Sequence, residues 1–219
     1  MSKNRLKESP KVLGLDVSTR TIGWALFDIQ TKELLELTHV SPVPKPKEEN
    51  KIKELILKSE IFKTKLVQYK DLGITKVIIE EPLLNSNNVY TVATLLKFNG
   101  MISKVVSEVL NVIPEFISSN DARRYSFPEL VQKRTHNKKG EPYKQKDIDK
   151  ASPVLFGEYP WEVDKKMVIW EKVANLEPQI VWEYDRNQNL KKENFDMTDS
   201  YACVRAVMCR DGIWDCTKK

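Results

Sequence analysis

Four carboxylates occupy positions in the sequence where an acidic residue calls for a chemical reason. Asp16 interrupts the apolar run VLGLDVSTRTIGWALFD, and Glu80 ends the apolar run KVIIE. Asp196 and Asp199 are spaced i, i+3 in DMTDSYA, a spacing that places two side chains on the same side of a helix. A buried carboxylate is normally protonated, paired with a cation or bound to a metal. If the segments that carry these acids meet, four carboxylates converge on one site.

Converging carboxylates are typical of a site for divalent cations, which relieve the repulsion between like charges. Mg²⁺ prefers oxygen ligands, keeps several waters and bridges carboxylates to phosphate oxygens. Two such ions about 4 Å apart can activate water and stabilise the leaving oxygen during phosphodiester hydrolysis. His39 and His136 are the only histidines, and the three cysteines lack the spacing of a zinc site. We therefore expect a metal held by oxygen, and cysteines that are reduced thiols.

Each acid also has an ordinary structural interpretation. Asp16 could pair with Arg20, and Glu80 could be a solvated acid at the end of a strand. Either aspartate of the i, i+3 pair could cap a helix or complement its dipole, because acids are common in the first helical turn. The metal hypothesis therefore depends on the four acids as a set.

The pattern of apolar residues predicts the elements that must position these acids. Apolar and alternating runs predict strands at 12–17, 21–28, 32–40, 76–84 and 112–119. Helical periodicity predicts helices at about 52–66, 87–110, 119–125, 164–176 and 197–210. This order predicts an α/β fold in which an antiparallel meander begins a mixed sheet with helices on its faces. Gly100 lies inside the longest predicted helix, where glycine costs about 1 kcal/mol relative to alanine, so we expect it to mark close packing.

Length and composition favour one globular domain. The 219 residues are enough for a substantial core, and we expect a single domain over 1–219 with insertions. Hydrophobic residues make up 41% of the chain and charged residues 31%, which is typical of a folded chain. The start has no apolar signal-peptide region, and no window is apolar enough to span a membrane. We therefore expect an intracellular protein with no membrane partner.

A basic segment interrupts the second half of the chain. From about 127 to 160 the sequence is polar and broken by prolines and glycines, which predicts an inserted, mobile element. Between Gln132 and Lys150 there are seven basic residues and three acidic ones. A solvated loop is the ordinary interpretation of such a run. Contact with DNA phosphates is the alternative beside a nuclease site.

Three motifs, in order, resemble those of the RuvC family of Holliday junction resolvases, within the RNase H-like or retroviral integrase superfamily. LGLDVSTRTIGWALFD resembles the family's first motif, a strand that carries a metal-binding aspartate and is followed by a hairpin. VIIEEPL resembles the second, whose first glutamate is the ligand, which selects Glu80 rather than Glu81. DMTDSYACVRA resembles the C-terminal motif. The resemblance implies an RNase H-like mixed five-stranded sheet, three antiparallel strands followed by parallel strands, flanked by helices.

The resemblance also implies an activity, a cofactor and a partner. It implies a Mg²⁺-dependent endonuclease that resolves four-way (Holliday) DNA junctions by two-metal-ion hydrolysis, leaving 5′-phosphate and 3′-hydroxyl ends. Asp16 would bridge both ions, Glu80 would hold one, and Asp196 and Asp199 would complete the other; Mn²⁺ is expected to substitute. Symmetric cutting of two strands implies a homodimer. The helix around Leu95–Val109 is the candidate interface, although its apolar stripe could equally be core.

Basic side chains are the expected DNA contacts, since phosphate contacts position a protein without reading sequence. They are Lys165 or Lys166, Arg123, Arg124, Lys138, Lys139, Lys144 and Lys146, each with a solvated surface charge as its ordinary alternative. Leu83 stands where the family carries an aromatic wedge, and a role in unstacking bases is a hypothesis. Stacking on bases or packing in the core are the alternatives for Trp161, Trp170, Trp182 and Trp214.

Two departures from the family suggest a phage or viral-type branch. The 127–160 segment is longer than the family's usual connection, and IVWEYDRNQNLKKENF is extra. The expected location is the cytoplasm or nucleoid, or the host cytoplasm for a phage or viral protein. The rival interpretations are a less selective nuclease on branched DNA or packaging intermediates, an inert binding protein, and an actin-like or sugar-kinase-type ATPase fragment. The last resembles GLDVSTRTIG but requires a second glycine-rich phosphate loop, which is not visible among the seven glycines.

Overall fold

A five-stranded sheet forms the centre of the computed structural model, which describes residues 9–82, 88–160 and 162–216. Its strands are β1 (Lys11–Val17), β2 (Ile22–Asp28), β3 (Leu34–Val40), β4 (Ile74–Glu80) and β5 (Glu115–Ile117). They are arranged in the order β3-β2-β1-β4-β5. The first three pair antiparallel, whereas β4 and β5 join parallel to β1. The predicted mixed sheet is confirmed.

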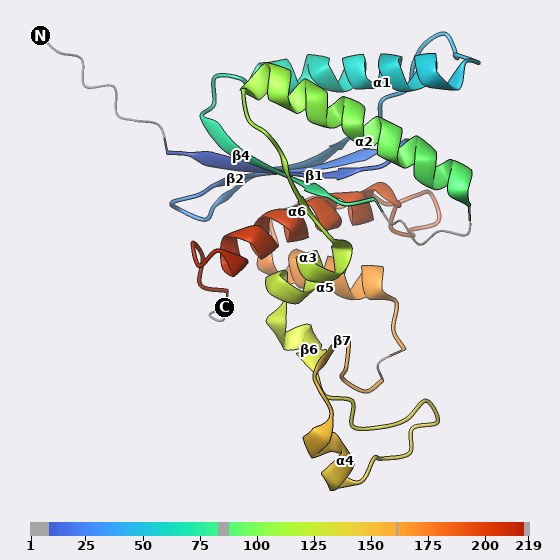
Figure 1. The fold of residues 1–219 in the computed structure, drawn as a ribbon, viewed down its shortest axis with the longest axis vertical. Coiled ribbons are helices and arrows are strands. Elements are labelled where there is room, and N and C mark those ends of the chain that lie inside the picture. The colour runs from blue at the N-terminus through green and yellow to red at the C-terminus, as the bar shows by residue number, and fades with distance from the viewer. Residues whose placement is uncertain (1–8, 83–87, 161, 217–219) are drawn as a thin grey trace, which may run out of the picture.

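Helices cover both faces of the sheet (Figure 1). One face carries α1 (Lys51–Leu66), the short 3₁₀ helix η1 (Val67–Tyr69) and α2 (Val89–Leu110). The other carries α6 (Glu193–Arg210), with α3 (Ser119–Ser126) and α5 (Lys165–Leu176) packed beyond it. Among the helices of the described residues, none combines the length and the apolar character needed to cross a bilayer.

The alternation of side chains along β1 separates two apolar cores. Leu13, Leu15 and Val17 point toward α1 and α2, where they join a buried cluster with residues of both helices. Val12 lies on the opposite face and packs against α6. Because side chains alternate along a strand, Asp16 lies on the α6 face with Val12. The alternation of side chains along β1 therefore places Asp16 next to α6 rather than next to α1 and α2.

The structure corrects one expectation for α2 and settles one alternative. A Cβ placed on Gly100 would meet no atom within 4 Å, so this exposed glycine does not mark close packing. The apolar stripe of the helix, Phe98, Ile102, Val105 and Val106, is buried against the sheet and α1. These four residues are thus intramolecular core, whereas Leu96 of the predicted stripe is exposed.

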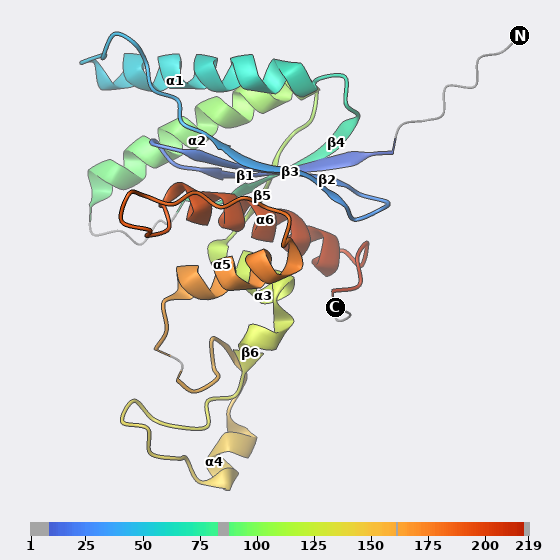
Figure 2. The ribbon, with the colours of Figure 1, turned by 180° about the vertical axis from the view of Figure 1, so that it is seen from behind.

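The predicted insertion contains short elements of its own. They are η2 (Pro128–Leu130), β6 (Val131–Gln132), α4 (Gln145–Lys150) and β7 (Val154–Leu155). β6 and β7 form a two-stranded antiparallel sheet, and Figure 2 shows the segment around α4 projecting away from the main sheet, below α5. The basic residues of this segment are therefore carried outward from the body of the molecule.

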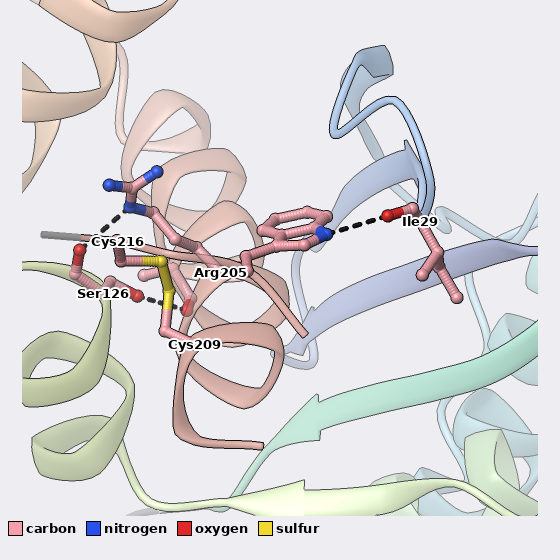
Figure 3. The surroundings of a disulfide bond; sticks show 7 residues. Ile29, Ser126, Arg205, Cys209 and Cys216 are labelled. Carbon is pink, nitrogen blue, oxygen red and sulfur yellow. Dashed lines mark hydrogen bonds between the residues drawn. A yellow bond between two sulfur atoms is a disulfide. The ribbon is translucent and has the colours of Figure 1, made fainter. Parts of the chain in front are cut away.

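The chain after α6 turns back and is joined to the helix by a disulfide (Figure 3). Cys209 and Cys216 are bonded with their Cα atoms 5.8 Å apart, so the expectation of reduced thiols is wrong for this pair. Trp214, between them, is buried and donates its Nε1–H to the Ile29 carbonyl at 2.9 Å. Cys203 is a free, buried thiol, as expected. The turn that reverses the chain, with Gly212 at φ +69°, brings the two sulfurs together.

Candidate metal centre

Two neighbouring parallel strands bring the first two acids together. Leu15 of β1 pairs with Ile79 of β4, so Asp16 and Glu80 are the next residues along each strand. Both follow residues that face α1 and α2, and so both point to the α6 side. The pairing of the two predicted strands and the alternation of their side chains thus place two carboxylates side by side.

Two glycines allow α6 to approach the sheet closely enough to contribute a third acid. A Cβ on Gly14 of β1 would overlap the backbone oxygen of Ser200, and one on Gly23 of β2 would overlap that of Asp196. Gly23 is also the partner of Asp16 in the β1–β2 register. The helix therefore lies directly on the backbone of these strands, with Asp199 facing the strand that carries Asp16.

Three of the four predicted ligands meet at one point. Oxygens of Asp16, Glu80 and Asp199 all lie within 4.8 Å of one another, and among the described residues this is the one such group of acids, histidines or cysteines. Asp196 lies one helical turn before Asp199 and outside that group. It is still near, because its charge contributes to raising the pKa of Asp16. The structure thus gathers a triad with a fourth acid beside it.

The pKa values of these acids reflect their crowding. Burial, followed by the charges of Glu80 and Asp199, raises the pKa of Asp16 well above its ordinary value. Burial and the charge of Asp199 raise the pKa of Glu80 to about 8, and burial raises that of Asp196 to about 6. A bound cation stabilises ionised carboxylates, so cation binding would reverse these shifts and release protons.

Two predicted DNA contacts border the triad. Arg123 Nη2 lies 3.3 Å from Asp199 Oδ1, and Lys166 Nζ lies 3.7 Å from Asp199 Oδ2. Lys166 is half exposed, which leaves its ammonium able to face a ligand from solvent. Neither cation pairs with Asp16 or Glu80, which have no ion-pair partner among the described residues. The positive charge therefore only partly neutralises the site.

The oxygen donors fit a hard divalent cation. Three carboxylates from three different elements share one point. Asp16 and Glu80 form no ion pair among the described residues, and burial and neighbouring acids raise their pKa values. Mg²⁺ is bound by one or two carboxylates together with waters and phosphate oxygens, which leaves room for a substrate. Asp16, Glu80 and Asp199 would hold such an ion, and Asp196 could contribute from the edge of the site.

The structure contradicts several of the ordinary interpretations of the single acids. Asp16 forms no ion pair with Arg20 among the described residues. Asp196 and Asp199 lie inside α6, which begins at Glu193, earlier than predicted, so neither is its N-cap. Asp196 does lie in the first turn, where an acid complements the helix dipole. Glu81, in contrast, is exposed and has only its backbone N–H bonded, to the Ile117 carbonyl, as expected for a solvated acid.

Several predicted DNA contacts lie apart from the triad. Lys165 places its Nζ 5.8 Å from the centre of the Phe156 ring, at the base of the insertion, and Arg124 is exposed on α3. The insertion lysines are exposed: Lys138, Lys139, Lys144 and Lys146. Leu83, the proposed wedge position, lies outside the described residues.

Tryptophan packing favours the core over base stacking. Trp170 and Trp182 contact each other edge to face at 5.9 Å between ring centroids, and Trp182 packs against the buried cluster around α6. Trp214 is buried beneath the disulfide-linked turn. Trp161 lies outside the described residues.

Two features of the site were missed by sequence reasoning. Cys203 lies one turn after Asp199, fully buried, and burial together with the charges of Glu80 and Asp16 raises the pKa of its thiol. The i, i+4 spacing from Asp199 was the available signal. Arg20 and the turn around residues 183–192 form a groove beside the acids, and only tertiary packing reveals it.

Comparison with solved structures identifies the fold, whereas no family model and no curated protein matches the sequence. Thermus thermophilus RuvC is similar with a TM-score of 0.52 and 13% identity over 93% of this chain and 97% of its own. The T. thermophilus RuvC in complex with a Holliday junction substrate gives a TM-score of 0.55 and 10% identity over the same shares. A ROK hexokinase from T. thermophilus aligns over 55% of this chain and 39% of its own at 18% identity, with a TM-score of 0.33, too low to indicate a shared fold. This chain therefore has the RuvC-like form of the RNase H-like fold along nearly its whole length.

Proposed function

We propose that this protein is a divalent-metal-dependent endonuclease that resolves four-way DNA junctions. The observation that carries the proposal is the meeting of Asp16, Glu80 and Asp199 within 4.8 Å on a RuvC-like fold. One of the similar RuvC structures holds a Holliday junction substrate. The partly neutralised site, with a half-exposed lysine at its edge, suits a phosphodiester that brings its own negative charge.

The acids of the site would bind cations, and its basic residues would position the substrate. Asp16, Glu80 and Asp199 would hold the metal, with Asp196 completing a second ion position. When bound, two divalent ions supply an activated water and stabilise the leaving oxygen of the phosphodiester. Lys166 and Arg123 would orient non-bridging phosphate oxygens, since both already contact the outer side of Asp199. The expected products carry 5′-phosphate and 3′-hydroxyl ends.

Resolution requires two cuts, so we extend the proposal to a homodimer with one site per strand. An isologous interface places two identical sites in a symmetric relation. Because several apolar residues of α2 are core, an interface on this helix would use its exposed residues, among them Val89 and Leu96.

The test is a parallel digestion of four-way, three-way, flap and linear DNA with Mg²⁺ or Mn²⁺. Paired symmetric nicks on the four-way substrate alone support a resolvase. Comparable cutting of all four substrates supports the alternative, a less selective nuclease on branched DNA or packaging intermediates. An absence of cleavage on every substrate with either ion contradicts both.

A further inference from the structure

Three adjoining cavities form a groove that leads away from the carboxylates. The first, about 900 Å³, is lined by Lys166 and Asp196 at the site and by Arg20 farther out. The second, about 500 Å³, shares Arg20 with the first and extends to the start of α1. The third, about 200 Å³, shares Lys58 with the second and ends at α2. We call this continuous feature the Arg20 groove.

One wall of the Arg20 groove is the turn formed by residues 183–192, which lies within the segment that we expect from the sequence to be extra relative to the RuvC family. Tyr184 and Leu190 form an antiparallel bridge across it. Glu183, at its base, accepts a hydrogen bond from Lys191 Nζ at 2.7 Å and lies 3.1 Å from His39 Nε2 on β3. Asn194 donates to the Glu183 carbonyl at 2.6 Å. The wall is therefore attached both to the sheet and to α6.

The opposite wall is the turn between β1 and β2, the hairpin that follows Asp16. Ser18 accepts the Thr21 N–H and donates its hydroxyl to the Thr21 carbonyl, which closes the turn. Lys58 of α1 donates to the Thr19 carbonyl at 2.7 Å and fixes the turn to the helix. Arg20, at its tip, is exposed and projects from a fixed backbone.

Cations without partners distinguish this groove from an ordinary charged surface. Arg20, Lys47 and Lys192 are exposed and form no ion pair among the described residues. Two acids nearby are paired, Glu54 with Lys51 and Lys58, and Glu48 with Lys53. Asp185 accepts backbone N–H groups but forms no ion pair among the described residues. The three unpaired cations are therefore available to an anionic ligand along the groove.

Three acids of the lining form no ion pair among the described residues: Asp185 and Asp196 in the first cavity, and Glu193 in both of the larger ones. Asp196 belongs to the carboxylate site, where a bound cation would compensate its charge. The negative charge of Glu193 opposes an anionic ligand in the groove. This residue supplies a test of sign, because its neutralisation should act opposite to the loss of a cation.

We infer that the Arg20 groove binds the sugar–phosphate backbone of the DNA strand that continues from the cut site. Its unpaired cations are spread over the two larger cavities, which fits a chain of phosphates better than one small anion. The inference rests on the proposed function, and adds the path by which the substrate leaves the carboxylates. The turn at 183–192 forms one wall of this path.

The test is the salt dependence of DNA binding in EDTA, where no cleavage occurs. The groove variant is Arg20→Ala/Lys47→Ala/Lys192→Ala, and the control is Lys32→Ala/Lys70→Ala/Lys104→Ala, which removes the same charge from exposed positions outside the groove. Each lost phosphate contact reduces the magnitude of the slope of log K against log salt by about 0.9. The slope of the groove variant should therefore be smaller in magnitude by about 2 to 3. The variant should also bind at least about tenfold more weakly. The control should match the wild type.

Further experiments distinguish the possible ligands. Glu193→Gln should tighten binding of the same four-way junction, and shortening the junction arms should remove the difference between the wild type and the groove variant. Competition by a mononucleotide at constant ionic strength would instead indicate a small-ligand pocket and overturn the inference. An unchanged slope in the groove variant, in a protein that still binds and cuts DNA, also overturns it and leaves the proposed function intact. Failure of the wild type to bind any DNA contradicts the proposed function itself.

Discussion

Glu80 lies where its ionised form is disfavoured unless a cation is present. Burial and the charge of Asp199 raise its pKa to about 8, although Arg123 and Lys166 act in the opposite direction. Burial and the charges of Glu80 and Asp199 likewise raise the pKa of Asp16. At the residue scale, the site is built at a cost in stability, which is typical of functional positions rather than structural ones.

Removing either strand acid should abolish cleavage without abolishing DNA binding. Asp16→Asn and Glu80→Gln keep the size of the side chain but remove a cation ligand, so cleavage of a synthetic four-way junction should fall by at least about 10³-fold. Binding measured by fluorescence anisotropy should persist, because the phosphate contacts come from other residues. Glu81→Gln, next in the chain and exposed, is the matched control and should cut normally. Full cleavage by either variant would reject the metal assignment.

The pH dependence of stability provides a second test at this scale. Glu80 binds its proton more tightly in the folded protein than in the unfolded chain, where its pKa has the ordinary value of 4.5. This contribution is fully present at low pH and is lost as pH rises from about 4.5 to about 8. The melting temperature of the metal-free protein should fall over this range, and it should fall less steeply for Glu80→Gln. Equal slopes for the two proteins in EDTA would contradict the assignment.

At the scale of the element, α6 depends on two glycines to reach the sheet. Its contact with β1 and β2 positions Asp199, and a Cβ at Gly14 or Gly23 would overlap the helix backbone. The basic insertion is the second element with a functional expectation, because it carries exposed lysines outward from the body (Figure 2).

Alanine at Gly23 should lower the melting temperature and abolish cleavage, because α6 must shift to make room. Gly100→Ala is the matched control. Gly100 is in a helix with open space around it, so alanine should increase the free energy of unfolding by about 0.5–1 kcal/mol and leave cleavage unchanged. Thermal unfolding and junction cleavage measure both effects. Wild-type stability in Gly23→Ala would show that α6 does not lie as described.

Neutralising the insertion lysines should weaken DNA binding through lost phosphate contacts. We expect Lys138→Ala/Lys139→Ala/Lys144→Ala/Lys146→Ala to bind less tightly and to show a flatter dependence on salt. Titration at several salt concentrations measures both quantities. A slope equal to that of the wild type would indicate that this segment is only a solvated loop.

At the scale of the whole molecule, local patterns in the sequence predicted the sheet and two of its acids. Apolar runs predicted the strands that carry Asp16 and Glu80, and the order of elements predicted the mixed topology, whereas the shared face of the two acids follows from the register of β1 and β4. The start of α6 was placed too late, because the residues from Glu193 lack a strong N-cap signal. Features made by distant contacts were not visible. The disulfide depends on the turn after α6, and the Arg20 groove depends on contacts such as His39 with Glu183, far apart in sequence.

The central claim is that Asp16, Glu80 and Asp199 bind divalent cations together. Anomalous diffraction from crystals soaked in Mn²⁺ tests it most directly, because Mn²⁺ prefers the same oxygen ligands and scatters anomalously. We expect at least one strong peak within coordination distance of carboxylate oxygens from all three residues, and no such peak in Asp16→Asn. Manganese bound only elsewhere on the molecule, with these three side chains unliganded, would contradict it.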